Sequence, residues 1–155
     1  MNIENQVCSL EYAKKLLTLG VKQNSYFYWC CLSNIPQLRT NLEFQIGCDY
    51  SAFTASELFD ILPHRITLKE CEPFNSFRLS MQKSIICKDM NNVDKFKIAY
   101  TYIINYECDS TEMAGEDAWF KRQLFTSSIW DISLVNAAAK TLIHLIENGY
   151  IKHEK

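Results

Sequence analysis

A strict alternation of side chains along residues 95–108 constrains the fold more than any other feature of the sequence. Large apolar or aromatic side chains occupy every second position, at Phe96, Ile98, Tyr100, Tyr102, Ile104 and Tyr106. Successive side chains of a β-strand point to opposite faces, so this period predicts a strand with one buried face. Two other extended runs, residues 65–72 and 77–88, precede it and are separated by short polar breaks. Together the three runs predict an antiparallel meander.

The N-terminal part of the chain predicts a helix followed by an aromatic strand. Residues 10–19 carry apolar side chains at helical spacing, after a capping Ser9 and before Gly20, which suits a left-handed C-terminal residue. Residues 25–32 are dense in aromatic side chains and predict a strand. A polar link follows, and residues 42–47 predict a further short strand.

Two more helices are predicted downstream. Thr54 and Glu57 form a capping-box pattern that opens a short helix, and Pro63 ends it. A long helix is predicted over about residues 132–148, because apolar side chains recur there at helical spacing up to Gly149.

These elements predict an α+β fold, in which an antiparallel meander sheet is packed by an N-terminal helix, a short middle helix and a long C-terminal helix. The chain has 155 residues, of which 48% are hydrophobic and 22% charged. A chain of this length can bury a sizeable core without a metal or disulfide. We therefore predict a single domain over residues 1–155.

The seven cysteines indicate buried thiols rather than a metal or disulfide framework. Their number is odd, no C-x-x-C pair occurs, and Cys30 directly precedes Cys31. Neither a signal-peptide pattern nor an apolar stretch of membrane-spanning length is present in the sequence. We expect a soluble cytoplasmic protein with reduced cysteines, no metal site and no membrane contact.

Residues 12–29 resemble a helix-turn-helix, with Gly20 at the position of the turn. Lys15 and Leu16 depart from the residue types of that motif, and the second element is rich in strand-forming aromatics. The formal charge of −2 also disfavours a protein held to DNA by its net charge. We do not expect DNA as the partner, and a DNA-binding regulator is kept as an alternative function.

Catalytic patterns are sparse. The sequence contains no G-x-S-x-G, H-E-x-x-H or Walker pattern, and the three histidines His64, His144 and His153 lie far apart. We expect no catalytic residues and no cofactor. A small nucleotide-processing enzyme is the second alternative, and it requires His64 or His144 to meet a carboxylate or a cysteine in a cleft.

Binding features are better developed. The chain has twenty aromatic residues, and residues 65–108 are locally basic within an acidic chain. Arginine, hydroxyl groups and a stacking ring near a helix N-terminus suit an anion or a nucleotide. The predicted ligand-binding residues, in order of preference, are Arg78, Trp119, Lys121, Arg122, His64 and Arg65.

Three blocks of the sequence resemble a family of small, uncharacterised proteins of phages and prophages. The blocks are QVCSLEYAKKLLTLGVKQNSYFYW, YSAFTASELFDILP and AAAKTLIHLIENGYI. They cover about a third of the chain and keep their order. The resemblance implies a mobile-element origin, and it implies no catalytic mechanism and no binding residues.

The favoured function is that of a non-enzymatic phage accessory protein that acts by stoichiometric binding. Its expected partner is a host protein or a small nucleotide-type ligand, with counter-defence as the biological setting. Capture of a ligand predicts a pocket with arginine and aromatic walls, whereas blocking a protein predicts a broad exposed apolar patch. The same hypothesis allows a homo-oligomer.

Overall fold

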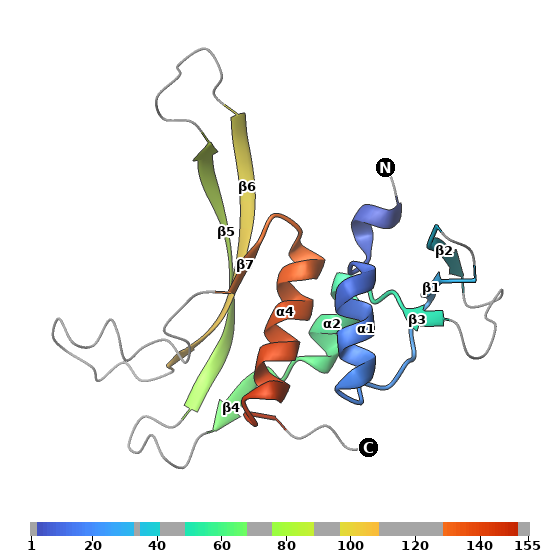
Figure 1. Cartoon of the computed structure of the whole chain (residues 1–155). Helices are drawn as coiled ribbons and strands as arrows, with labels where there is room; N and C mark the ends of the chain where they lie inside the picture. Colours follow the sequence, from blue (N-terminus) through green and yellow to red (C-terminus); the bar gives the residue numbers. More distant parts are fainter. Residues whose placement is uncertain are drawn as a thin grey trace, which may run out of the picture. The chain divides into compact units, whose positions relative to one another are not determined.

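The computed structural model describes residues 3–32, 35–40, 49–67, 76–88, 97–108 and 129–151. The chain divides into two compact units, one formed by Met1–Leu62 with Ala138–Lys155 and the other by Pro63–Ala137. Each unit contains one antiparallel sheet, and helices lie near the N-terminus, in the middle and near the C-terminus of the chain (Figure 1). The predicted α+β class is therefore confirmed. The single domain stays a prediction.

The N-terminal helix of the first unit ends where the sequence predicts. After a 3-10 turn at Ile3–Gln6, helix α1 spans Leu10–Thr18. Gly20 follows with φ of +84°, and the Val21 backbone N–H donates to the Leu16 carbonyl at 3.0 Å. This hydrogen bond gives a partner to a carbonyl in the last turn of the helix.

The other two helices also follow the predicted signals. Helix α2 spans Ala55–Ile61, and its capping box of Thr54 and Glu57 is fully formed. Helix α4 spans Leu134–Glu147 and is followed by Gly149 with φ of +71°. Because the boundary between the two units falls between Ala137 and Ala138, α4 begins in one unit and ends in the other.

The first unit contains a three-stranded sheet in the order β2-β1-β3, with β1 at Phe27–Cys30, β2 at Gln37–Thr40 and β3 at Asp49–Ser51. The predicted strand over residues 25–32 is confirmed at its centre, but it does not join the meander. It pairs instead with residues 37–40, which the sequence had indicated as a link, because a short reversal of the chain brings them alongside. The predicted strand over residues 42–47 lies outside the described residues.

The second unit contains the predicted meander. Strands β4 (Arg65–Thr67), β5 (Ser76–Lys88), β6 (Lys97–Cys108) and β7 (Ile129–Asp131) pair in chain order and antiparallel. Strand β7, which the sequence did not predict, pairs with the centre of β6.

The strand β1 also bears on the helix-turn-helix alternative. That alternative requires a second helix after Gly20, whereas residues 21–26 contain no helix and β1 follows at Phe27–Cys30. The aromatic side chains that disfavoured the motif in the sequence are those of this strand.

Each unit has its own buried side chains. In the first unit α1 contacts α4: the Lys15 ammonium lies 2.9 Å from a Glu147 carboxylate oxygen, and the Lys140 ammonium lies 5.7 Å from the centre of the Tyr12 ring. Its largest fully buried side chains are Leu16, Phe53, Leu58, Leu62, Leu142 and Leu145, and those of the second unit are Ile104 and Tyr106. Within the described residues, no helix is both long and apolar enough to cross a membrane.

Candidate functional site

Three of the six predicted site residues lie together in the second unit. Arg65 on β4 pairs directly with Arg78 on β5, and His64 immediately precedes β4. All three side chains are exposed. The β-carbons of directly opposed residues in an antiparallel pair are about 5 Å apart, so the two arginines start from adjacent points of the sheet.

The alternation of the strands places these arginines on the solvent side. The next pair along the two strands is Ile66 and Phe77, which are only 4% and 5% exposed. Neighbouring positions on a strand face opposite ways, so Arg65 and Arg78 share the other face.

Hydrogen bonds fix the backbone of this corner. The Leu79 N–H donates to the His64 carbonyl at 3.0 Å. The Tyr106 hydroxyl on β6 donates to the Pro63 carbonyl at 2.5 Å. The Tyr106 side chain is fully buried, and this burial raises the pKa of its phenol above the ordinary value. The start of β4 is therefore held at two successive carbonyls.

The register places two like charges opposite one another at this corner. Like charges directly opposite one another on paired strands are destabilising. In register, Arg78 lies between Arg65 on β4 and Glu107 on β6, so two basic positions and one acidic position follow one another across the sheet. A planar guanidinium can bind phosphate or carboxylate oxygens in a bidentate manner.

The other predicted site residues, Trp119, Lys121 and Arg122, lie outside the described residues. His144, which the enzyme alternative considers, lies on α4 with its ring 6.2 Å from that of Tyr150, and its Nδ1 is 3.3 Å from the Asn148 side-chain nitrogen. In the part of the chain that the structure describes, no group of three or more His, Cys, Asp or Glu side chains could hold a metal ion.

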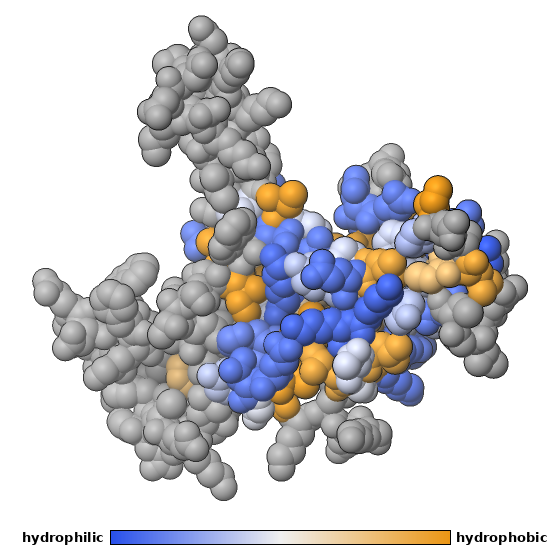
Figure 2. Space-filling model, in the orientation of Figure 1, coloured by the Kyte–Doolittle hydropathy of each residue, from blue (hydrophilic) through white to orange (hydrophobic). Residues whose placement is uncertain are grey.

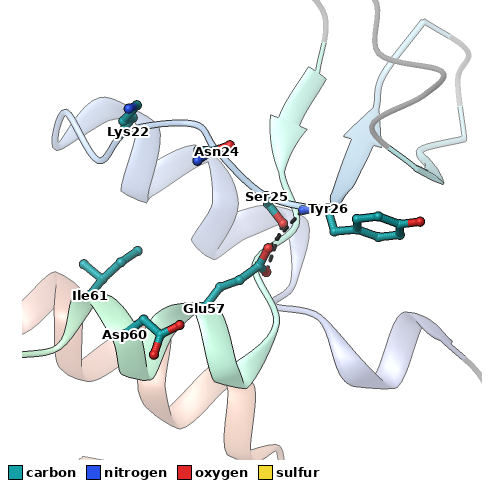
Figure 3. A pocket seen from close by; sticks show the side chains of 7 residues that line it. All are labelled: Lys22, Asn24, Ser25, Tyr26, Glu57, Asp60 and Ile61. Carbon is teal, nitrogen blue, oxygen red and sulfur yellow. Dashed lines mark hydrogen bonds between the residues drawn. The ribbon is translucent and has the colours of Figure 1, made fainter.

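The first unit contains a hollow that sequence reasoning did not identify (Figure 3). Its volume is about 530 Å³, within the range of small-molecule sites. One wall comes from the segment between α1 and β1 and the other from α2. The lining residues are Lys22, Asn24, Ser25, Tyr26, Glu57, Asp60 and Ile61.

The Glu57 carboxylate holds the two walls of this hollow together. Its Oε1 accepts a hydrogen bond from the Tyr26 backbone N–H at 2.9 Å. Its Oε2 accepts from the Ser25 hydroxyl at 3.1 Å and from the Thr54 N–H and hydroxyl at 2.7 and 2.9 Å. The carboxylate therefore caps α2 and also binds the residues that lead into β1.

The capping-box signal identified Glu57 as a helix-start residue but not as a link to Ser25 and Tyr26. Those residues lie about thirty positions earlier in the chain, and no local pattern records the pairing. Of the remaining lining residues, Lys22, Asn24 and Asp60 are exposed and polar, and Ile61 is partly exposed. Their common place at the hollow is a result of the tertiary fold.

Exposed apolar side chains occur in both units. The described residues of this kind are Ile3, Leu17, Tyr26, Leu32, Ile35, Met81 and Ile132. On the face drawn in Figure 2, the hydrophobic colour falls in several patches between hydrophilic residues.

Comparison with family models, with curated proteins and with solved structures found no match to this chain.

Proposed function

We propose that the protein acts by stoichiometric, non-enzymatic binding of a phosphate-bearing ligand of nucleotide type, and that Arg65 and Arg78 contact its phosphate. The observation that carries the proposal is the register of β4 and β5, which opposes two exposed arginines on one face of the sheet. An anion bound by both guanidinium groups offsets the repulsion between them.

The fixed backbone of this corner supports the proposal. The Pro63 and His64 carbonyls are both engaged by β5 and β6, so the backbone positions of Arg65 and Arg78 relative to each other are set before a ligand arrives. Preorganisation of this kind lowers the entropy that binding costs. The exposed His64 ring adjoins Arg65 in the chain and supplies a further hydrogen-bond donor.

The resemblance to phage and prophage proteins supplies a setting for this activity. A binder of this kind produced in a host cytoplasm would sequester a nucleotide signal and so act in counter-defence. Trp119, Lys121 and Arg122 are proposed as further contacts, with the indole ring stacking on a base. Blocking of a host protein is the other form of the same proposal.

Isothermal titration with ATP and with cyclic di-AMP tests the proposal. We expect saturable binding of at least one probe, and an affinity about tenfold lower for Arg65→Ala or Arg78→Ala, because charge-assisted hydrogen bonds to phosphate are lost. Arg39→Ala is the matched control, since Arg39 also lies on a strand, β2, but in the other unit. Its affinity should equal that of the wild type.

Recovery of the probe separates binding from catalysis. After long incubation, chromatography should return the nucleotide unchanged, and a hydrolysed product would support the enzyme alternative instead. The ligand proposal is wrong if neither probe binds or if the Arg65→Ala/Arg78→Ala double variant binds as tightly as the wild type. Capture of one host protein by the wild type and not by the double variant would identify a protein as the partner.

A further inference from the structure

We propose that the hollow between the α1–β1 segment and α2 is a second binding site, which takes a basic amino acid with a free carboxylate, either as the free molecule or as the last residue of a peptide. This site lies entirely in the first unit, so it is independent of the arginine pair. Two observations support it: unpaired charges at the rim and a rigid carboxylate between the walls.

The two charged residues at the rim are available to a ligand. Lys22 and Asp60 are exposed, and within the described residues neither side chain has a hydrogen-bond or ion-pair partner. Figure 3 shows Lys22 on the segment that follows α1 and Asp60 on α2, with Asn24 on the same segment as Lys22. An ammonium group and a carboxylate group that line one hollow match a ligand carrying both charges.

The rigid carboxylate belongs to Glu57. Its Oε2 accepts three hydrogen bonds, and its Oε1 accepts one, from the Tyr26 N–H. A carboxylate oxygen has two lone-pair positions, so Oε1 can accept one further donor. Asp60 follows Glu57 by three residues on α2, which puts both carboxylates on the same side of the helix (Figure 3).

The charges of the lining residues select the ligand class. One ammonium, that of Lys22, stands against the two carboxylates of Glu57 and Asp60, which leaves an excess of negative charge. A ligand whose carboxylate meets Lys22 and whose cationic side chain meets Asp60 and Glu57 Oε1 complements this arrangement. Tyr26 contributes its backbone N–H to this arrangement, whereas its ring lies 5.2 Å from the Phe27 ring and points away from Lys22 and Asp60 (Figure 3).

An NMR titration of the full chain with L-arginine tests the site. We expect saturable shifts of the Lys22, Asn24 and Tyr26 amides, because the Tyr26 N–H is bonded to Glu57 Oε1. Asp60→Asn and Lys22→Met should each weaken binding about fivefold, the upper range for an exposed ion pair. Glu11→Gln, which removes an exposed carboxylate on α1, is the matched control and should leave the affinity unchanged.

Changing the ligand tests the same contacts without altering the protein. L-citrulline, which lacks the cation, and L-argininamide, which lacks the carboxylate, should each bind more weakly than arginine. The Lys22→Met variant should bind argininamide as weakly as it binds arginine, because the substitution and the amide each remove the same ion pair, that between Lys22 and the ligand carboxylate. Tighter binding of Gly-Gly-Arg than of arginine assigns the site to peptide C-termini, and the reverse order assigns it to the free amino acid.

Three results would overturn the proposal. The first is a set of shifts that never saturate, and the second is shifts confined to residues away from the hollow. The third is equal affinity of arginine, citrulline and argininamide. Failure of nucleotide binding at Arg65 and Arg78 has no bearing on these outcomes.

Discussion

At the scale of single residues, a few buried or half-buried polar groups hold parts of the chain that are far apart in sequence. Glu57 joins the start of α2 to the residues before β1, and Tyr106 joins β6 to the residue before β4. Cys8 is fully buried, and its thiol lies 4.0 Å from the Ser51 carbonyl. Loss of the hydrogen bonds of Glu57, and substitution or ionisation of the buried Cys8 and Tyr106, should therefore lower stability.

Replacement of Glu57 by glutamine should destabilise the first unit. The carboxylate accepts four hydrogen bonds through its two oxygens. In glutamine an NH2 group replaces one of these oxygens, and because it donates, it cannot accept the hydrogen bonds made there. We expect a loss of about 2–3 kcal/mol in the free energy of unfolding, measured with urea. Ser56→Ala, at an exposed position of the same helix, is the control. A loss below about 0.5 kcal/mol, the usual effect of a surface substitution, would contradict this account.

Cys8 predicts a fall in stability at alkaline pH. Burial, partly offset by hydrogen bonding with the Phe53 backbone, raises the pKa of its thiol from 9.0 to about 12. Above about pH 9 the unfolded chain loses this proton and the folded chain retains it, so the free energy of unfolding falls as pH rises from about 9 to about 12.

Urea unfolding at about pH 8 and about pH 10 measures this effect. The fall in unfolding free energy between the two should be smaller in Cys8→Ala than in the wild type, by roughly 1.4 kcal/mol. Tyr106, whose pKa is also raised by burial, is retained in both proteins and contributes equally to both falls. Equal falls in the two proteins would show that the thiol does not titrate in this way.

At the scale of elements, local signals account for the helix ends. The glycine after α1, the capping box of α2 and the glycine after α4 are all read from neighbouring residues, and the structure confirms each of them. The ends and the partners of strands are predicted less closely by local signals, because the hydrogen bonds of a strand are completed by residues elsewhere in the chain. Residues 37–40 became β2 by pairing with β1, although their own composition indicated a link.

The Gly20→Ala substitution isolates the cost of the helix end. An added β-carbon would meet no atom within 4 Å, so the cost comes only from the backbone φ of +84°. We expect a loss of about 1 kcal/mol in unfolding free energy, and a smaller loss for Gly20→Asn, because asparagine tolerates the left-handed conformation better. An alanine variant as stable as the wild type in urea would mean that the chain leaves α1 by another conformation.

At the scale of the whole molecule, α4 is the element that both compact units share. Val135 and Ala137 are buried on the part of α4 that belongs to the second unit, and Leu142 and Leu145 on the part that belongs to the first. A single domain, as the sequence predicts, would unfold in one transition that involves both units. This gives the predicted single domain a direct test.

Leu142→Ala should lower the stability of the chain by about 2–5 kcal/mol, because it removes a fully buried side chain. Ile132→Ala, at a position that is 66% exposed, is the control. In variants that keep only Trp29 in the first unit or only Trp130 in the second, both fluorescence transitions should shift together in urea. A shift of the Trp29 transition alone would show two independently folding domains.

The sequence by itself determined the α+β class, the three helices with their ends, and the meander of β4, β5 and β6. These features depend on residue periodicity, capping and turn residues, which act over a few neighbouring positions. Only the tertiary structure decided that β1 forms its own sheet, that Arg65 opposes Arg78, and that Glu57 bonds to Ser25 and Tyr26. These pairings join residues that are distant in the sequence. They are selected by many backbone hydrogen bonds and buried side chains acting together, and no local pattern specifies them.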